Sequence, residues 1–242
     1  MTVGNIYSLI DGFAPFSLAE EWDNSGILVG DEKSPAEKIL VALDCTMEVA
    51  LEAVDKGVDL IVTHHPLIFD PLYNLSFESI PSVLISNKIS LVSAHTNLDK
   101  AAVSLNMAKE LGLQSPSCDG FVVVGETKEM TAEELAEKCQ NVFSAEKIRY
   151  VKGDRSIKKV ALCSGSGGSE LMNAIKMGAD AFVTGDIKHD VFLEAKRLDI
   201  TLVDAGHYET EKIYMPHLAA FLASSGAAVE MSSAEERPYR VF

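Results

Sequence analysis

Apolar residues along this chain gather in short β-branched runs that alternate with amphipathic stretches. Residues 41–65 begin with an apolar run, pass through a polar turn into residues with helical spacing, and continue through a Gly-x-Asp turn. They end in the buried run at 60–63, and Pro66 stops further strand pairing. Strand, helix and strand in this order form a βαβ unit, so the pattern predicts an α/β protein.

The same order of residue types returns at residues 160–186, which open with Val-Ala-Leu as residues 41–43 do. A third strand repeats as well, since "ISLVSAHT" at 89–96 corresponds to "ITLVDAGH" at 200–207. The matched pairs are Ala53 with Ala174, Gly57 with Gly178, Asp59 with Asp180, Val62 with Val183, and Thr63 with Thr184. Two matches in one order indicate an internal duplication. We therefore predict two similar βαβ-type lobes, with largely parallel sheets flanked by helices and right-handed crossovers.

The boundaries of the lobes follow from turn residues. The first lobe is predicted over residues 1–120, joined by the C-terminal segment 212–242, and the second over residues 121–211. Pro and Gly in "LGLQSPSCDG" at 111–120 are typical of a connector. A capping box of Thr131 and Glu134 predicts a helix start just inside the second lobe. The tail "ERPYRVF" at 236–242 is predicted to be a final strand that returns to the first lobe.

Composition narrows the class of protein. Hydrophobic residues make up 47% of the 242 residues and mean hydropathy is +0.12, as in a well-packed globular protein. No apolar run approaches the ~18 residues that cross a bilayer, and we expect no signal peptide. The four cysteines are widely spaced, which indicates reduced thiols and a cytoplasmic protein. A net charge of -15 argues against a membrane-surface partner and against duplex nucleic acid.

Polar residues that suit a metal ion follow the predicted strands. His64 and His65 come after the second strand of the first lobe, and "AHTNLD" after the third carries His95 and Asp99. In the second lobe, "AGHYETE" carries His207 and Glu211, and "TGDIKHD" carries Asp186, His189 and Asp190. Because these residues follow the carboxyl ends of strands, we expect them to face one crevice between the lobes.

Imidazole and carboxylate groups are ligands that suit Zn, Mn or Fe. His207 and Glu211 are four residues apart, which places both on one face of a helix. Adjacent histidines in an irregular loop can splay toward two ions a few Å apart. The sequence thus predicts a dinuclear site, with positions open for water, on His64, His65, Asp99, His207 and Glu211. The alternatives are a hydrogen-bonded His-His-Pro loop and an i,i+4 surface pair, whereas His217 is predicted to be structural or exposed.

Two further motifs allow a functional and a structural interpretation. The loop "GSGGSE" at 165–170 lies between a strand and a helix, as anion-binding loops do, but it lacks the full phosphate-loop spacing, which favours a tight turn. Trp22, Asp23 and Asn24 form a polar-aromatic cluster. That cluster is either a Trp packed on a helix with an Asx turn, or a substrate-binding wall.

Taken in order, "EWDNSGILVG", "THHPLIF", "AHTNLD", "TGDIKHD" and "GHYETE" resemble the motifs of the Nif-three-like family of dinuclear-metal proteins, also described as type-two GTP cyclohydrolase I homologues. The resemblance spans nearly the whole chain. It implies a two-lobed α/β fold, a toroidal homohexamer built as a trimer of dimers, and two divalent ions per subunit on the five ligands given above. One departure is the "TGD" loop, where His189 is followed by Asp190 instead of a second aromatic residue or histidine.

The leading functional hypothesis is a dinuclear-metal-dependent hydrolase that acts on a nucleotide or related heterocycle. In a cyclohydrolase reaction, water attacks the imidazole ring carbon of GTP, and a second hydrolysis releases formate and leaves a dihydroneopterin-type product. His95 is predicted to move protons, and Trp22, Asp23 and Asn24 to bind substrate. The alternatives are a dimetal phosphoesterase, and a hexameric regulatory or chaperone-like metal-binding protein without turnover. Metal positions open to polar surroundings favour an enzyme, and enclosed metals favour the last alternative.

Overall fold

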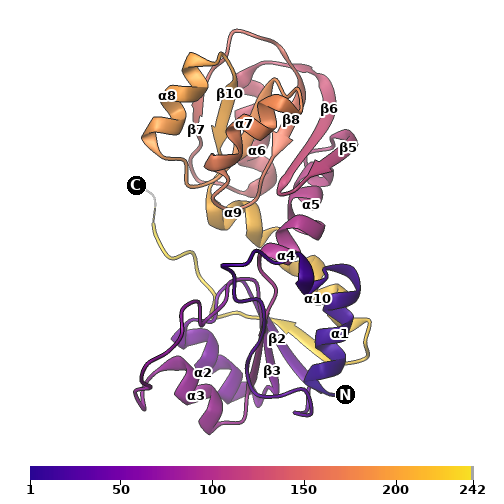
Figure 1. Ribbon diagram of the computed structural model, residues 1–242, viewed down its shortest axis with the longest axis vertical. Helices are drawn as coiled ribbons and strands as arrows, with labels where there is room; N and C mark the ends of the chain where they lie inside the picture. The colour runs from indigo at the N-terminus through magenta and orange to yellow at the C-terminus, as the bar shows by residue number, and fades with distance from the viewer. Residues whose placement is uncertain (241–242) are drawn as a thin grey trace. The chain divides into compact units, whose positions relative to one another are not determined.

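The computed structural model describes residues 1–240, which form two compact α/β units (Figure 1). The first unit comprises Met1–Ala101 and Tyr214–Pro238, and the second comprises Ala102–Ile213 with residues 239–240. The sequence pattern instead extends the first lobe to about residue 120. Within the described residues no helix is long and apolar enough to cross a membrane.

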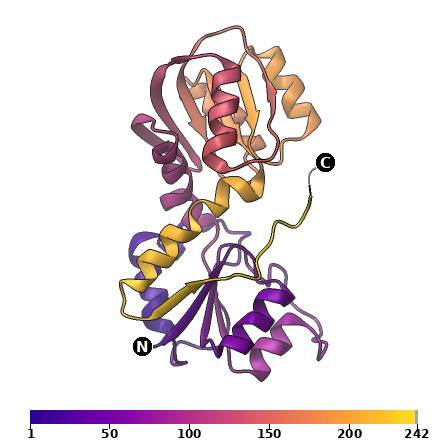
Figure 2. The same ribbon diagram turned by 180° about the vertical axis from the view of Figure 1, so that it is seen from behind.

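The first unit is a five-stranded sheet with helices on both faces. Its strands lie in the order β1-β4-β3-β2-β11, all parallel except β1, which is antiparallel to β4. Helices α2 and α3 cover one face, and α1 with α10 cover the other (Figures 1 and 2). The elements are α1 (Val3–Phe13), η1 (Phe16–Leu18), β1 (Gly26–Val29), β2 (Lys38–Ala42), α2 (Met47–Lys56), β3 (Leu60–Thr63), α3 (Ile80–Ser86), β4 (Ser90–Ser93), α4 (Thr96–Leu98), α10 (Met215–Ala223) and β11 (Ala228–Met231).

The second unit has a six-stranded mixed sheet in the order β5-β6-β8-β9-β10-β7. Strands β8, β9 and β10 are parallel, whereas β5, β6 and β7 pair antiparallel. Buried side chains of α5 and α6 pack on one face, and those of α7 and α8 on the other. The elements are α5 (Ser104–Glu110), β5 (Gln114–Asp119), β6 (Val122–Met130), α6 (Ala132–Phe143), β7 (Arg149–Val151), β8 (Ile157–Leu162), η3 (Gly168–Glu170), α7 (Leu171–Lys176), β9 (Ala181–Thr184), α8 (His189–Arg197), β10 (Thr201–Asp204) and α9 (His207–Lys212). The boundary between the units falls within the π-helix η2 (Asp99–Val103).

The two units share one order of elements. Strand–helix–strand–helix–strand runs β2-α2-β3-α3-β4 in the first unit and β8-α7-β9-α8-β10 in the second. The likeness extends upstream, because β1 and β7 each precede this core and each pair antiparallel with its last strand. Two similar α/β lobes flanked by helices are therefore confirmed, with three parallel strands at the centre of each sheet.

One repeated residue performs the same task in both units. The Oδ2 atom of Asp59 accepts hydrogen bonds from the backbone N–H groups of Glu37 and Lys38 at 3.0 and 2.9 Å. Asp180 Oδ2 accepts from those of Lys158 and Lys159, both at 2.9 Å. In each unit the Gly-x-Asp turn thus fixes the start of the neighbouring strand, which accounts for the repeated Asp.

Local capping explains where several helices begin and end. Thr131 and Glu134 form the expected capping box of α6, and Thr46 caps α2, which ends at Gly57 in the left-handed conformation with φ 61°.

The strand predicted at residues 236–242 is absent at 236–240, and residues 241–242 lie outside the described residues. The C-terminal segment instead supplies β11, earlier in the chain. All four cysteines lie within the described residues, and no disulfide joins any of them.

Candidate metal centre

The loop that follows β3 is fixed by local hydrogen bonds. Thr63 Oγ1 donates to the carbonyl oxygen of His65 at 2.8 Å, and the His65 N–H donates to the carbonyl oxygen of Leu43 at 2.9 Å. His64 is fully buried, and His65 is 23% exposed. The two imidazole rings lie with their centroids 5.0 Å apart, so adjacent histidines do present both rings on one side of the strand end.

His95 follows β4 and joins the same cluster. Its ring centroid lies 5.2 Å from that of His64 and 5.5 Å from that of His65. One nitrogen from each of the three rings lies within 4.8 Å of the others, which is close enough for one metal ion to reach all three. Sequence reasoning assigned His95 to proton transfer only. Its position directly after a strand, one residue before the position that corresponds to His207, was the signal for a possible ligand.

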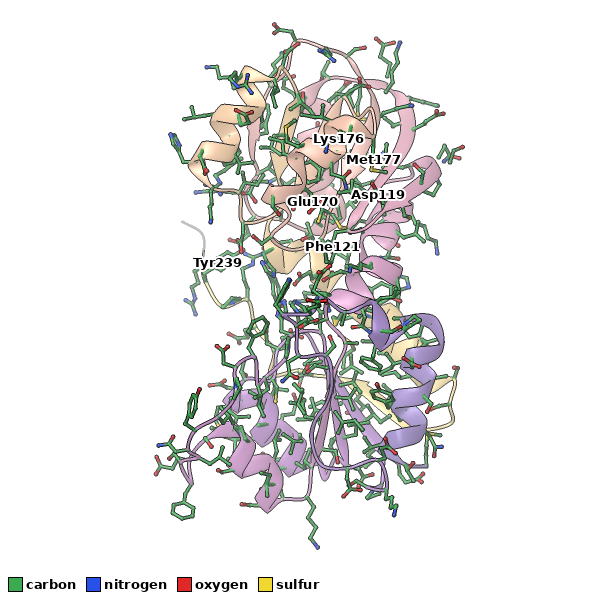
Figure 3. The ribbon with its side chains drawn as sticks, in the orientation of Figure 1. Asp119, Phe121, Glu170, Lys176, Met177 and Tyr239 are labelled. Atoms are coloured by element: carbon green, nitrogen blue, oxygen red, sulfur yellow. The ribbon has the colours of Figure 1, made fainter. Side chains whose placement is uncertain are left out.

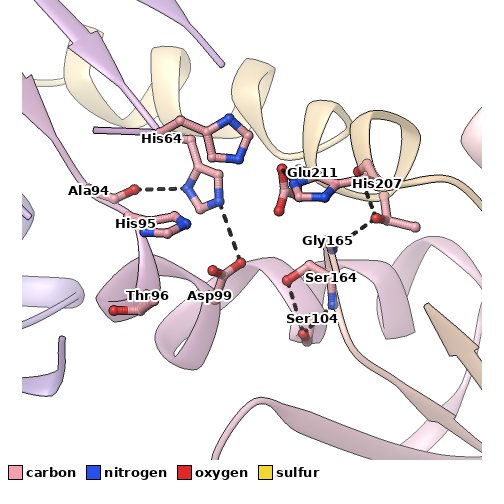
Figure 4. Close-up of polar contacts among 12 residues, drawn as sticks. His64, Ala94, His95, Thr96, Asp99, Ser104, Ser164, Gly165, His207 and Glu211 are labelled. Carbon is pink, nitrogen blue, oxygen red and sulfur yellow. Dashed lines mark hydrogen bonds and ion pairs between the residues drawn. The ribbon is translucent and has the colours of Figure 1, made fainter. Parts of the chain in front are cut away.

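In each of the four candidate ligand histidines, the three of this cluster and His207 of the second unit, the Nδ1 atom is hydrogen-bonded to an oxygen. The acceptors are the carbonyl oxygen of Ala94 for His64 (2.8 Å, Figure 4), Asp44 for His65 (2.8 Å), Asp23 for His95 (2.9 Å) and Asp186 for His207 (2.8 Å). A carbonyl or carboxylate oxygen accepts and does not donate, so the proton resides on Nδ1. The lone pair is then on Nε2, which is the arrangement that metal-binding histidines share.

In both units a carboxylate faces one of these Nε2 atoms. Asp99 Oδ1 lies 3.6 Å from His64 Nε2 (Figure 4), and Glu211 Oε2 lies 3.1 Å from His207 Nε2. Two groups that both carry lone pairs repel each other unless a proton or a cation lies between them. A divalent cation satisfies both at once, so this donor set fits a metal ion.

Asp99 takes its position from an irregular helix. It opens the π-helix η2, which follows α4, and its side chain is 10% exposed. A π-helical turn is a rare distortion that occurs mostly at functional sites. Nothing in the sequence pattern indicates it, although the position of Asp99 after a strand did identify the residue.

In the second unit, helix α9 presents His207 and Glu211 one turn apart, as the i,i+4 spacing predicts. Gly206 precedes the helix with φ 89°, a conformation that favours glycine. A Cβ atom on Gly165 would clash with Glu211 Oε1, so glycine is needed for the loop to approach this buried carboxylate.

The "GSGGSE" loop binds its own chain. Ser104 Oγ accepts from the N–H of Ser164 at 3.1 Å, and Thr210 Oγ1 accepts from that of Gly165 at 3.0 Å. Thr184 Oγ1 accepts from the N–H of Gly167 at 2.8 Å. Because the N–H groups of Gly165 and Gly167 bond within the chain, the loop serves as the tight turn that the sequence favoured, and its bond to Thr210 joins it to α9.

The N-terminal cluster surrounds His95. The carboxylate of Asp23 is buried and accepts hydrogen bonds from His95 Nδ1, from the N–H of Asn24, from Ser25 Oγ, and from the N–H and Oγ1 of Thr96. Burial alone would raise the pKa of Asp23, but the bonds from His95 and Thr96 outweigh it and hold the pKa well below its usual value. Asp23 therefore orients His95 as an ionised carboxylate.

The remaining predicted residues lie further from the imidazoles or at the surface. Trp22 is 58% exposed, and its ring lies 5.9 Å from that of Phe69 and 6.3 Å from that of His95. Asn24 Nδ2 donates to the carbonyl oxygen of Ile68 at 2.6 Å. His189, Asp190 and His217 are exposed on helices, His189 and Asp190 on α8 and His217 on α10. Substrate contact by Trp22, Asp23 and Asn24 stays a prediction.

The fold and these clusters define a two-unit α/β protein whose strand ends carry histidine and carboxylate groups able to hold a metal ion. The model of the Duf34/NIF3 (NGG1p interacting factor 3) family matches residues 1–238, so the chain belongs to that family.

Two relatives are similar over at least 92% of their length. A Campylobacter jejuni protein named GTP cyclohydrolase 1 type 2 homolog is 34% identical over 248 residues, and the match covers 100% of both chains. A Helicobacter pylori protein named GTP cyclohydrolase 1 type 2 is 34% identical over 230 residues, which is 92% of each chain. Among solved structures, Staphylococcus aureus protein SA1388 has a TM-score of 0.90 at 30% identity, with 100% of this chain and 99% of that chain covered. Reduced HcgD from Methanocaldococcus jannaschii has a TM-score of 0.85 at 31% identity, with coverage of 96% and 98%.

Proposed function

We propose that this protein is a dinuclear-metal-dependent hydrolase of a nucleotide or related heterocycle. The observation that carries the proposal is the shared orientation of the four histidines, each with Nδ1 donating to an oxygen and Nε2 turned the other way. The names of the relatives from Campylobacter and Helicobacter support GTP as the substrate to test first.

The proposed ligands of two divalent ions, Zn, Fe or Mn, are His64, His65, Asp99, His207 and Glu211, with His95 as a further nitrogen donor. When bound, the ions would supply Lewis-acid activation of water near neutral pH. The roles of the chain are then separate. Asp44, Asp23 and Asp186 hold three imidazoles in the tautomer that binds metal, and Ala94 holds the fourth.

His95 is proposed to hold or move a proton if it does not bind metal. Its Nδ1 proton is fixed on Asp23, as in the buried carboxylate–imidazole pairs that orient a catalytic base. Trp22, whose ring approaches that of His95 edge-on, is proposed to stack on the base of the substrate.

The test is product analysis with purified protein loaded with Zn, Mn or Fe and incubated with GTP. Formate release supports a cyclohydrolase, and phosphate release supports a dimetal phosphoesterase. His64→Ala should abolish either product, and the exposed His217→Ala should retain it. If neither product forms with any of the three metals, hydrolysis of GTP is refuted, and a metal-binding role without turnover becomes the better hypothesis.

Assembly and location are proposed from the family resemblance. We propose a cytoplasmic homohexamer, as the family resemblance implies. Light scattering of the metal-loaded protein should give about six times the chain mass of 26.2 kDa. A mass near that of one chain would refute the hexamer.

A further inference from the structure

Residues 232–235 follow β11 and extend its contact with β2 in the first unit. Strand β11 ends at Met231, which pairs in register with Val41. The N–H of Ser232 then donates to the carbonyl oxygen of Val41 at 2.8 Å. These four residues, which we call the C-terminal clamp, therefore lie beside the carboxyl end of β2.

Glu52 of α2 fixes the backbone of the clamp. Its Oε1 accepts a hydrogen bond from the N–H of Ser233 at 3.0 Å, and its Oε2 accepts one from that of Ala234 at 3.1 Å. The hydroxyl groups of Ser232 and Ser233 donate to the same carboxylate, whose side chain is 9% exposed. Hydrogen bonds to an ionised group are stronger than those between neutral groups, so these bonds hold the clamp in one conformation.

Glu235, the last residue of the clamp, holds Leu43. Leu43 directly follows β2, and its N–H donates to Glu235 Oε1 at 2.8 Å. Leu43 is 1% exposed, so water has little access to this N–H. Without Glu235 a buried N–H would lose its acceptor, and the backbone at Leu43 would move to recover a partner.

Leu43 and Asp44 in turn hold both the backbone and the ring of His65. The carbonyl oxygen of Leu43 accepts from the His65 N–H at 2.9 Å, and Asp44 Oδ1 accepts from His65 Nδ1 at 2.8 Å. Because the N–H and the carbonyl group of Leu43 are both bonded, the direction in which the chain enters Asp44 is fixed. A continuous path of hydrogen bonds thus joins Glu52, the clamp, Leu43 and His65.

The second unit covers the equivalent strand end in another way. Leu162 of β8 corresponds to Leu43 in the duplication, and it pairs with Val123 of the neighbouring strand β6. In the first unit the neighbouring strand β11 has already ended, and the side chain of Glu235 supplies the acceptor instead. The first unit is also the copy with two adjacent histidines at the next strand end, which favours a role for the clamp at that site.

We propose that Glu52 and Glu235 are positioning residues for the His65 imidazole, although neither belongs to the predicted ligand set. Glu52 immobilises the clamp, Glu235 sets the position of Leu43, and Leu43 with Asp44 orients the ring. That His65 then binds a metal ion rests on the proposed function, whereas the orientation of the ring requires no metal.

The first measurement is nitrogen NMR of the histidines in metal-free full-length protein at about pH 8, where an ordinary imidazole is neutral. It gives the fraction of His65 rings that carry the proton on Nδ1, with the signals assigned by their loss in His65→Ala. This fraction should fall in Glu235→Ala and in Glu52→Gln, because both changes release Leu43. Glu235→Gln keeps the Oε1 acceptor and should retain the natural fraction. A His65 ring that is unchanged in both Glu235→Ala and Glu52→Gln would overturn the proposal.

The second measurement is a competition titration of Zn²⁺ against a chelator. Groups that orient a metal-binding histidine from outside typically change metal affinity by about 10–100-fold, and Glu235 acts through further residues, so Glu235→Ala should weaken binding by about three- to tenfold. This loss should shrink when Asp44→Ala is already present, because both residues act on one imidazole. A role in stability alone would leave the affinity unchanged, or would add its full loss to that of Asp44→Ala, and either result refutes positioning.

Two matched controls change the same segment of the chain. Glu236→Ala removes an equal charge from the next residue, which is exposed. Tyr239→Phe removes the bond that the Tyr239 hydroxyl donates to Glu209 Oε2 at 3.2 Å (Tyr239 is labelled in Figure 3). Both should leave the His65 ring and the Zn²⁺ affinity unchanged, and a loss as large as that in Glu235→Ala would refute the path through Glu235.

The two measurements separate this inference from the proposed function. A changed His65 ring with unchanged Zn²⁺ affinity refutes His65 as a metal ligand and leaves its positioning intact. An unchanged ring in a protein that hydrolyses GTP refutes the clamp alone.

Discussion

The hydrogen bond from His65 to Asp44 allows a quantitative test of how the chain prepares a metal ligand. Asp44 Oδ1 lies 2.8 Å from His65 Nδ1, and removing the carboxylate with Asp44→Ala frees the ring to rotate and to move its proton. Hydrogen bonds to charged groups contribute about 1.5–3 kcal/mol. Asp44 is 43% exposed, so solvent screening places the effect at or below the lower end of this range. Since 1.4 kcal/mol corresponds to a factor of ten, metal affinity should fall by about tenfold.

The assay is a competition titration of the metal against a chelator of known affinity. Asp44→Asn keeps an acceptor without its charge, so its loss should be smaller than that of Asp44→Ala. Asp55→Ala, on the exposed side of α2, is the matched control and should leave the affinity unchanged. If Asp44→Ala binds metal as tightly as the natural protein, the imidazole does not depend on Asp44 and the interpretation of the Nδ1 bonds fails.

Three further predictions concern metal content and stability. His65→Ala should remove most of one metal equivalent, and Glu211→Ala should remove more because a bridging carboxylate serves both ions. His217→Ala should remove none. Metal analysis that finds two metals in Glu211→Ala, or a loss in His217→Ala, would disprove the ligand set. Burial would raise the pKa of Glu52, but hydrogen bonds from Ser232, Ser233 and Lys56 outweigh it and hold the pKa below the usual 4.5. The ionised Glu52 therefore contributes to the free energy of unfolding above pH 4.5, and this contribution is lost as the pH falls. In denaturant unfolding, Glu52→Gln should lower the free energy of unfolding by about 2 kcal/mol at pH 7 and by progressively less at lower pH. A loss of stability that does not depend on pH would contradict this prediction. Thr131→Ala should destabilise by about 1 kcal/mol through loss of the α6 cap, and an unchanged unfolding midpoint would argue against that cap.

The duplicated core was predictable because its strands are buried on both faces. Such strands are near-continuous apolar runs, as at 39–42 and 60–63, and Thr46 caps the helix between these two. The edge strand β7 was missed, since its three residues are at most half-buried and have no pattern of their own. Ser17 and Glu20 have capping-box spacing, yet Ser17 lies within η1, and Glu20 forms an ion pair with Lys100. Tertiary contacts decided the conformation there.

The candidate ligands were identified from strand ends, but their supporting acceptors were not. Asp44 is 21 residues from His65, Asp23 is 72 from His95, and Asp186 is 21 from His207. Exposed or loop carboxylates at such separations resemble many others in an acidic chain, so no periodicity identifies them. Only the folded sheet shows which carboxylate meets which imidazole.

The Asp that ends each Gly-x-Asp turn has a consequence for how a duplicated gene diverges. Asp59 and Asp180 each accept hydrogen bonds from two consecutive backbone N–H groups at the start of the neighbouring strand, β2 or β8. These bonds fix the strand register at the amino ends of both sheets. A slip of one residue would exchange the side chains that pack on the two helical layers, so these ends tolerate little change. The opposite ends differ between the copies, since one has His64 and His65 where the other has Gly185 and Asp186. New chemistry can therefore arise at one edge of each copy while the other edge preserves the architecture.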